Sequence, residues 1–465
     1  MAQSKLAKIS VYPPINAQIE HLDVEITAVD AAMIVARLNK AAHKDDNYDL
    51  ILKKIITKKN STLKIHLESF IDKNIEVIVA DSHDDSLILE PQGSFSRGQF
   101  NSFLTFIRKM QHIDLCKTQD VEAADKYTGF EELVLTPCSL PELNWEDINT
   151  STTFLGQKFS YPILITGMTG GIEQGATINR RLALAAAHYN IPMGVGSQRI
   201  AIEDDQYAEI FAIRKYTPDL FLIGNIGIAQ LRQGNELAIC QKAVDMIEAN
   251  ALAIHVNVLQ ELIQEEGNKN FRYFLDRIAK IAEEIHVPLI IKEVGSGLDE
   301  QSAHLLKERG INVMDIGGKG GTSWGYIEGL RSNDPTTRSL GDCFRNWGIP
   351  TAHSLTKIRQ NDSDTTLIAT GGIRDGLTVA KAVALGADMV GIGLPLFKAA
   401  LQADEAPAEV LSAITRELKI SMLCSGCQDL SQLKLRIRHK SELSEDFATQ
   451  IKATNVNIKH KLDMK

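Results

Sequence analysis

The chain of 465 residues lacks three features that would place it in a special class of protein. No apolar run reaches the roughly 18 residues of a membrane-spanning helix, and the start of the chain carries no apolar stretch typical of a secretion signal. Its six scattered cysteines make no disulfide framework. Positive charge is not in excess, since 50 Lys and Arg stand against 59 Asp and Glu, for a net charge of −9. These absences predict a cytoplasmic protein with neither a membrane nor a nucleic acid as its main partner.

What the sequence does contain is a series of eight short apolar segments, nearly all ending in glycines or polar residues. Stretches with helical spacing, such as 177–187 and 377–387, lie between them. Strands that alternate with helices in this way predict a (β/α)8 TIM barrel, whose active site forms at the carboxyl ends of the strands. The segments are 162–171, 191–199, 220–227, 251–258, 288–295, 313–319, 366–374 and 389–395.

The chain is too long for one barrel, which takes about 250 residues. Residues 1–105 are predicted to form a small α+β module in front of a barrel at 106–440, and 441–465 a charged tail. The module shows no nucleotide loop, metal cluster or nucleophile, so a docking or stabilising role is favoured, and the barrel from Phe106 is expected to fold alone. Its expected helices are 30–40 and 48–57, and its expected strands are 62–69, 74–80 and 86–91.

Two further segments have an expected role. The long interval from Lys319 to Asp364, between the sixth and seventh strands, is a candidate lid or active-site loop. Cys424 and Cys427 form a lone C-x-x-C in an apolar, helical stretch. Packing is the favoured interpretation for these two cysteines, with a redox or metal pair as the alternative.

Glycine-rich ends of the last two strands predict a phosphate-binding site. Gly371-Gly-Ile-Arg374 ends the seventh strand, and Gly391-Ile-Gly-Leu-Pro395 ends the eighth. In many barrels the backbone N–H groups at these two places hold a phosphate, helped by a helix N-terminus. The alternative is that the glycines only allow the chain to turn.

A lysine at the end of the fifth strand favours a flavin beside this phosphate site. Lys292 lies in an otherwise apolar strand and needs a partner, because an unpaired buried ammonium is costly. A cation near N1 and the C2 carbonyl of a flavin stabilises the reduced anionic ring. An ion pair with Glu293 or another carboxylate is the alternative. Small or neutral hydrogen-bonding residues at the first, second, third and sixth strand ends suit an isoalloxazine ring and, with Lys292, favour FMN: Gly167, Met168, Thr169, Ser197, Asn225 and Thr322.

The most distinctive stretch is H-V-N-V-L-Q-E at 255–261. His255 and Asn257 are two apart at the end of the fourth strand, so their side chains are expected on the same side. Gln260 and Glu261 follow in the loop above. A carboxylate here could hold Mg²⁺, which commonly takes one or two protein oxygens together with substrate phosphates. A polar cluster that caps the next helix is the alternative.

Positive charge for an anionic substrate comes from two other places. Arg108, Lys109 and His112 precede the first strand, and Ser197-Gln-Arg199 follows the second. Adjacent basic residues usually lie on the solvated surface. These residues are interpreted as a binding site only because a phosphate, a flavin and Mg²⁺ are predicted beside them. Together they would supply the charge that a diphosphate needs.

Taken together, these motifs resemble those of the type 2, FMN-dependent isopentenyl-diphosphate isomerases. The motifs that carry the resemblance stand in the family's order, and they are 108–113, 167–171, 196–199, 224–227, 255–261, 292–297, 315–324, 371–374 and 391–395. The resemblance implies a barrel that binds FMN and Mg²⁺ and interconverts isopentenyl and dimethylallyl diphosphate by a 1,3-allylic proton shift. It also implies reduced FMN as acid and base, NADPH or NADH as reductant, and a homo-oligomer, a tetramer or octamer.

The resemblance also implies roles for individual residues. Gln260, His255 and Asn257 would be catalytic, and Glu261 would hold the metal. The substrate would be bound by Arg108, Lys109, His112, Ser197, Gln198, Arg199 and Gln260. FMN would be bound by Gly167, Met168, Thr169, Ser197, Asn225, Lys292, Thr322, Gly371, Gly372, Ile373, Arg374, Gly393 and Leu394.

Two departures from the family and three rival functions complete the sequence-based picture. The family often has Ser and Arg where Gly317 and Lys319 stand, and it lacks the N-terminal module. A 2-hydroxy-acid oxidase would need a histidine near the end of the sixth strand, where this chain has none. A dihydroorotate-type dehydrogenase would need a Cys or Ser base loop. A non-catalytic flavin scaffold would have no use for the polar groups at 255–261.

Overall fold

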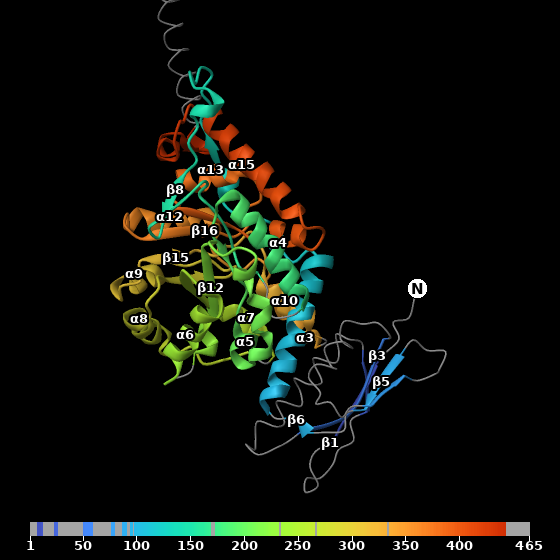
Figure 1. Ribbon diagram of the computed structural model, residues 1–465. Helices are drawn as coiled ribbons and strands as arrows, with labels where there is room; N and C mark the ends of the chain where they lie inside the picture. Colours follow the sequence, from blue (N-terminus) through green and yellow to red (C-terminus); the bar gives the residue numbers. More distant parts are fainter. Residues whose placement is uncertain are drawn as a thin grey trace, which may run out of the picture.

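The computed structural model describes residues 7–12, 23–26, 50–58, 76–79, 86–90, 94–95, 97–168, 173–231, 234–265, 267–332 and 334–442. Eight parallel strands close into a barrel, as the apolar segments predict (Figure 1). The last strand pairs with the first, with Ile163 opposite Val390, so no edge is left open. The strands are β10 (Ile163–Ile165), β11 (Met193–Gly194), β12 (Leu222–Gly227), β13 (Ala251–Val256), β14 (Leu289–Glu293), β15 (Val313–Asp315), β16 (Thr366–Thr370) and β17 (Met389–Ile392).

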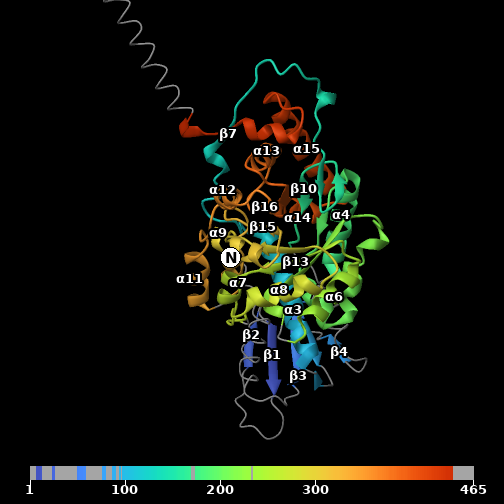
Figure 2. The same cartoon turned by 90° about the vertical axis from the view of Figure 1, so that its left-hand side faces the viewer.

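Helices follow the strands and surround the barrel, as Figures 1 and 2 show. The two helices predicted from their spacing, at 177–187 and 377–387, are confirmed by α4 and α13. The helices are α4 (Glu173–Tyr189), α5 (Arg199–Glu203), α6 (Glu236–Ile247), α7 (Val258–Ile263), α8 (Phe274–Glu284), α9 (Glu300–Glu308), α12 (Thr351–Asn361), α13 (Gly376–Ala384), α14 (Leu394–Ala400) and α15 (Ala406–Cys424). Among the described residues, no helix combines the length and apolarity needed to cross a membrane.

Aromatic rings close the amino-terminal end of the barrel. The hairpin of β8 (Thr152–Phe154) and β9 (Gln157–Phe159) contributes Phe154 and Phe159, which are buried against Phe221 just before β12. The ring centroids of Phe159 and Phe221 lie 5.6 Å apart in an edge-to-face contact. Because this end is filled, a ligand has to enter from the carboxyl ends of the strands.

Most of the interval 319–364 is helical, so the loop expected there is wrong, although Thr322 and Trp324 within it do line the mouth of the barrel. Beyond the short bridge at Lys319 it contains α10 (Trp324–Arg331), α11 (Pro335–Cys343) and α12. α10 and α11 form a tight hairpin, because a Cβ added at Gly329 would lie 2.7 Å from the Cα of Gly341. The interval therefore holds a packed helical pair beside the mouth.

The cysteine pair is split between two environments. Cys427 is buried, as expected for a packing residue, whereas Cys424 at the end of α15 is exposed. Both are free thiols. The packing interpretation therefore holds for Cys427 and is wrong for Cys424.

The N-terminal strands form an antiparallel sheet of their own. Its order is β2-β1-β3-β5-β4, with β6 paired to β3. The predicted helix at 48–57 is wrong, because Leu50–Lys58 is strand β3; its run of Ile and Thr residues suits a pleated surface. The predicted strands at 74–80 and 86–91 are confirmed by β4 (Glu76–Val79) and β5 (Ser86–Glu90). The other strands are β1 (Ala7–Tyr12), β2 (Asp23–Ile26) and β6 (Ser94–Phe95), and the helix expected at 30–40 and the strand at 62–69 lie outside the described residues.

A long helix joins this sheet to the barrel. α3 (Arg97–Thr118) begins two residues after β6 and packs against α5, α10 and α14. In Figure 1 it leads from the blue strands to the barrel. The boundary predicted at 105/106 therefore falls inside a continuous helix, and a deletion up to residue 105 would cut that helix.

We expect Phe159→Ala to destabilise the chain by about 3–5 kcal/mol, because it removes a fully buried ring and leaves a cavity. Urea unfolding followed by circular dichroism measures this change. Leu140→Ala is the matched control, since Leu140 is 83% exposed. Equal midpoints for the two variants would contradict the closing role of the hairpin.

Candidate active site

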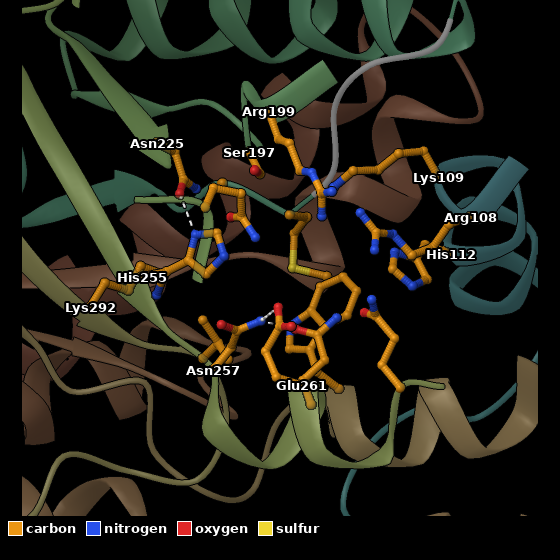
Figure 3. Close-up of a pocket in the computed structure, with 17 residues that line it drawn as sticks. Arg108, Lys109, His112, Ser197, Arg199, Asn225, His255, Asn257, Glu261 and Lys292 are labelled. Carbon is orange, nitrogen blue, oxygen red and sulfur yellow. Dashed lines mark hydrogen bonds between the residues drawn. The ribbon is translucent and has the colours of Figure 1, made fainter. Parts of the chain in front are cut away.

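Three connected cavities lie at the carboxyl ends of the strands. Counted together with the open space at the mouth they measure about 620, 540 and 300 Å³, and all three share Gly167 and Lys292 in their walls. We name the largest the basic chamber; it is bounded by α3, α5, α7 and the ends of β12–β14. Figure 3 shows the side chains that line it. The second, lined by the ends of β15–β17, is the glycine cleft. The third lies inside the barrel between them.

The basic chamber collects four cationic side chains and one carboxylate among its lining residues. Arg108 and Lys109 reach it from α3, Arg199 from the start of α5 and Lys292 from β14, while Glu261 is the carboxylate (Figure 3). Burial, reinforced by the nearby Arg108 and Arg199, lowers the pKa of Lys109 to about 7. Keeping this much positive charge buried costs free energy, and a multiply charged anion would offset that cost, so the chamber suits such a ligand.

His255 is held as a neutral ring with a defined tautomer. Asn225 donates its amide to the Val195 carbonyl at 2.9 Å, so its oxygen is left to accept from His255 Nδ1 at 2.8 Å. The proton is therefore assigned to Nδ1, and Nε2 carries a lone pair. Burial, together with the charges of Lys109 and Lys292, lowers the pKa of His255 to about 3. His255 offers an acceptor rather than a positive charge.

Residues 257–261 form one hydrogen-bonded group in the chamber wall. The Asn257 amide donates to Gln260 and Glu261, each at 3.1 Å, while Glu261 Oε2 accepts from the Asn268 backbone at 2.7 Å. Asn257 Oδ1 is buried without a protein partner. An unpartnered oxygen beside a buried carboxylate suits Mg²⁺ or one of its waters, because Mg²⁺ prefers oxygen ligands. The described residues hold no cluster of three or more His, Cys, Asp or Glu able to bind a metal by themselves.

A buried carboxylate ties three elements together behind the chamber. Glu328 on α10 accepts from His112 of α3 at 3.0 Å and from the Gln260 amide of α7 at 2.7 Å, and it is paired with Arg331. Arg331 and His112 keep the pKa of Glu328 well below its usual range although burial opposes this. Because Glu328 accepts from Gln260 Nε2, the orientation of the Gln260 amide is fixed.

Lys292 has a carboxylate partner one strand away. Its ammonium lies 2.8 Å from Asp315, which is opposite it in the β14–β15 register and also accepts from Thr370. Glu293 is not that partner: its carboxylate accepts from the backbone N–H groups of Val294, Gly295, Ser296 and Gly297. Lys292 still lines all three cavities, so its pairing leaves it available to a ligand.

The glycine cleft has the character of a phosphate and ring site. Gly371 and Gly372 have φ of 110° and 75°, and a Cβ at either would collide with Gly318 or Thr128. Gly393 and Leu394 complete the wall, with Leu394 at the start of α14. Arg374 adds a cation that is paired here with Glu122, and burial lowers its pKa to about 10. A wall of backbone with one guanidinium and Lys292 fits a flat phosphorylated cofactor such as FMN.

Comparison with known proteins agrees with this chemistry. The FMN-dependent dehydrogenase family matches residues 230–440. Isopentenyl-diphosphate delta-isomerase of a Nostoc species is 44% identical over 334 residues, covering 72% of this chain and 95% of the relative. The enzymes of that name from a Synechococcus species and Rickettsia rickettsii are 43% and 42% identical, over 70% and 71% of this chain and 94% and 97% of theirs.

The chain belongs to the FMN-dependent isopentenyl-diphosphate delta-isomerase family. It is therefore an enzyme. Solved structures of mandelate oxidase variants, one with (S)-mandelic acid and one with benzoyl-formic acid, are 17% identical with a TM-score of 0.50. They cover 72% of this chain and 93% and 97% of those chains. At this identity they support the fold alone.

The structure brings nearly all predicted site residues of this isomerase-family chain to the mouth. Gln198 is the exception: its amide is fully buried, donates to the Ala243 carbonyl and accepts from the Asn225 backbone, so it supports the wall and does not line the chamber. Thr169 lies outside the described residues. Those in the basic chamber are Arg108, Lys109, His112, Gly167, Met168, Ser197, Arg199, Asn225, His255, Asn257, Gln260, Glu261 and Lys292. Those in the glycine cleft are Gly167, Met168, Lys292, Thr322, Gly371, Gly372, Ile373, Arg374, Gly393 and Leu394.

The roles of three contributors to the isomerase-family site were not predicted from the sequence, although Asp315 and Trp324 lie in the motif at 315–324. Glu328 and Trp324 lie on α10, in the interval expected to be a loop, and Trp324 lines the chamber with an edge-to-face contact to His112. The spacing of Glu328 and Arg331, three residues apart, was the available signal for a helix there. Asp315 was visible at the end of the sixth strand, but its pairing with Lys292 depends on strand register. Lys319, one of the departures from the family, pairs with Asp125 at 2.8 Å and does not line the cleft.

We expect Glu328→Gln to lower kcat by about 100-fold, since losing the carboxylate frees the Gln260 amide from the orientation that its hydrogen bond to Glu328 fixes. Steady-state turnover of isopentenyl diphosphate measures this, and FMN affinity, followed by flavin fluorescence, should not change. Glu284→Gln, in the last turn of α8, is the control. Normal kcat in Glu328→Gln would rule out a positioning role for this carboxylate.

Proposed function

We propose that this enzyme interconverts isopentenyl and dimethylallyl diphosphate by a 1,3-allylic proton shift, with reduced FMN, Mg²⁺ and NADPH or NADH as reductant. The observation that carries the proposal is the basic chamber, which shares Gly167 and Lys292 with the glycine cleft. A diphosphate site thus opens directly onto a flavin-type site. The names of relatives at 40–44% identity support the same substrates.

The diphosphate end of the substrate would be bound by Arg108, Lys109 and Arg199, which line one chamber. The guanidinium groups suit two-point hydrogen bonding to phosphate oxygens. Glu261 and Asn257 Oδ1 would hold Mg²⁺ or its waters against the same diphosphate, which supplies the remaining oxygen ligands. Glu261, the single carboxylate in the lining, would then bind Mg²⁺ and would not repel the diphosphate.

The carbon end of the substrate would lie between Gln260, Trp324 and the glycine cleft. When bound there, reduced FMN supplies the acid and base that exchange protons with the allylic carbons. Lys292 would stabilise the negative charge of the reduced ring, and Asp315 keeps Lys292 in place. Gln260, oriented by Glu328, would position the alkene. Neutral His255 would contribute a hydrogen-bond acceptor to the chamber without adding charge.

The direct test is an anaerobic assay with isopentenyl diphosphate, FMN, NADPH and Mg²⁺, in which dimethylallyl diphosphate is followed. We expect product only when the flavin is reduced, and loss of product when Mg²⁺ is removed with EDTA. Gln260→Ala should bind FMN normally and turn over poorly. Normal turnover of Gln260→Ala would refute its role, and absence of product from the unchanged enzyme would refute the proposed function.

Substrate affinity should depend on pH through Lys109. Its lowered pKa of about 7 means that the free enzyme has lost this proton above pH 7, whereas the bound diphosphate favours the charged ammonium. Binding above pH 7 must therefore take up a proton, so KM should rise about ten-fold per pH unit there and be flat below. Lys109→Arg should abolish the rise, because the guanidinium stays charged. A rise of the same size in Lys109→Arg would assign the dependence to another group.

We also propose that the enzyme works in the cytoplasm as a homo-oligomer, a tetramer or octamer, as the family resemblance implies. The N-terminal sheet is the part of this chain that could alter such an assembly, since the motifs shared with the family begin only at Arg108. Sedimentation velocity of the full chain gives the oligomeric state.

A further inference from the structure

The N-terminal module is joined to the active site by a single uninterrupted helix. β6 ends at Phe95, where it pairs with Leu50 of β3, and α3 begins at Arg97. Arg108 follows 11 residues later, about three helical turns along α3. Movement of the sheet relative to the barrel would therefore be passed to the residues that line the basic chamber, because a helix is much stiffer than a loop.

The first half of α3 is a poor helix by its own sequence. Gly98, Asn101, Ser102 and Thr105 all have low helix propensity, and the first turn has no acidic residue to complement the helix dipole. Isolated helices shorter than about 12–15 residues are marginal in water even with favourable residues, and the part of α3 before Arg108 is shorter than that. The helix between the sheet and the chamber therefore depends on what holds its two ends.

Burial and neighbouring positive charge disfavour the ammonium of Lys109 at its place on α3 when no anion is bound. Arg108 and Lys109 are buried beside Arg199, and the lowered pKa of Lys109 reflects this burial and repulsion. The second half of the helix is secured by buried Ile113 and Cys116 and by the His112–Glu328 hydrogen bond. On the N-terminal side of the two cations, α3 begins two residues after β6, which belongs to the sheet.

We propose that the N-terminal sheet is a clamp that keeps α3 helical and in place before the substrate arrives, so that the diphosphate site is pre-formed. A relative covered to 95% of its length matches only 72% of this chain, and the motifs shared with the family begin at Arg108, beyond the sheet. Anything that shifts the sheet would change affinity for the diphosphate and leave FMN binding and the chemical step unchanged. This inference rests on the proposed function, because it takes α3 as the diphosphate-binding element.

The test uses the full chain with Gly-Ser-Gly-Ser inserted between Ser96 and Arg97, which keeps the sheet attached but uncouples it. We expect amides of α3 to lose protection in hydrogen exchange, and to regain it when inorganic pyrophosphate and Mg²⁺ are added. If one molecule in ten then has α3 in place, KM for isopentenyl diphosphate rises about ten-fold with kcat within about two-fold of normal. The dissociation constant of FMN should not change.

The control is the same insertion after Leu140, an exposed position in the loop before β8. A second pair of variants separates clamping from folding: Ser102→Pro interrupts α3 between the sheet and Arg108, whereas Ser102→Ala favours the helix. Ser102→Pro should reproduce the insertion and Ser102→Ala should not.

Unchanged protection of α3, or an unchanged KM, in both the insertion and Ser102→Pro would overturn the clamp. Protection lost but not regained with pyrophosphate would also overturn it, since α3 would then not be the diphosphate-binding element. Absence of isomerisation by the unmodified chain would instead overturn the proposed function. Hydrogen exchange and pyrophosphate binding need no turnover, so the two failures are distinguishable.

Discussion

Holding several positive charges inside one protein cavity is the constraint on which the rest of this structure depends. Arg108, Lys109 and Arg199 converge on a chamber with one carboxylate in its lining, and Lys292 lies at its inner end. Burial makes this arrangement costly until an anion arrives, as the lowered pKa of Lys109 shows. A bound anion would lower this cost, which is why the chamber suits an anionic ligand.

The surrounding structure holds these charges with carboxylates that lie outside the lining of the chamber. Asp315 fixes Lys292 from the neighbouring strand, and Glu328 sits behind the chamber, where it holds His112 and Gln260 but does not line the cavity. Burial lowers the pKa values of His112 and His255, so these two side chains contribute hydrogen bonds to the site without adding positive charge. The site therefore separates its binding charges from its positioning groups.

The barrel supplies rigidity at one end and an open mouth at the other. The aromatic cluster of Phe154, Phe159 and Phe221 fills the amino-terminal end, while the glycines after β15–β17 leave room at the carboxyl end. Only α3, which comes from outside the barrel, brings Arg108 and Lys109 across the chamber. Because α3 follows directly on the N-terminal sheet, a change in that sheet could alter the positions of Arg108 and Lys109 in the chamber.

The sequence by itself determined the eight strands, their parallel closure and most of the residues at the mouth. Each of these rests on a local pattern, such as an apolar run that ends in glycine or the two-residue spacing of His255 and Asn257. The tertiary structure alone decided contacts that depend on register and packing between distant segments. The pairing of Lys292 with Asp315 needs the alignment of two strands, and Glu328 reaches His112 across 216 residues of sequence. The tertiary structure also decided that Leu50–Lys58 is a strand, because its pairing with β1 and β5 outweighs its helical spacing. It decided as well that Gln198 faces the wall, since the Gln198 side-chain oxygen accepts a hydrogen bond from the Asn225 backbone.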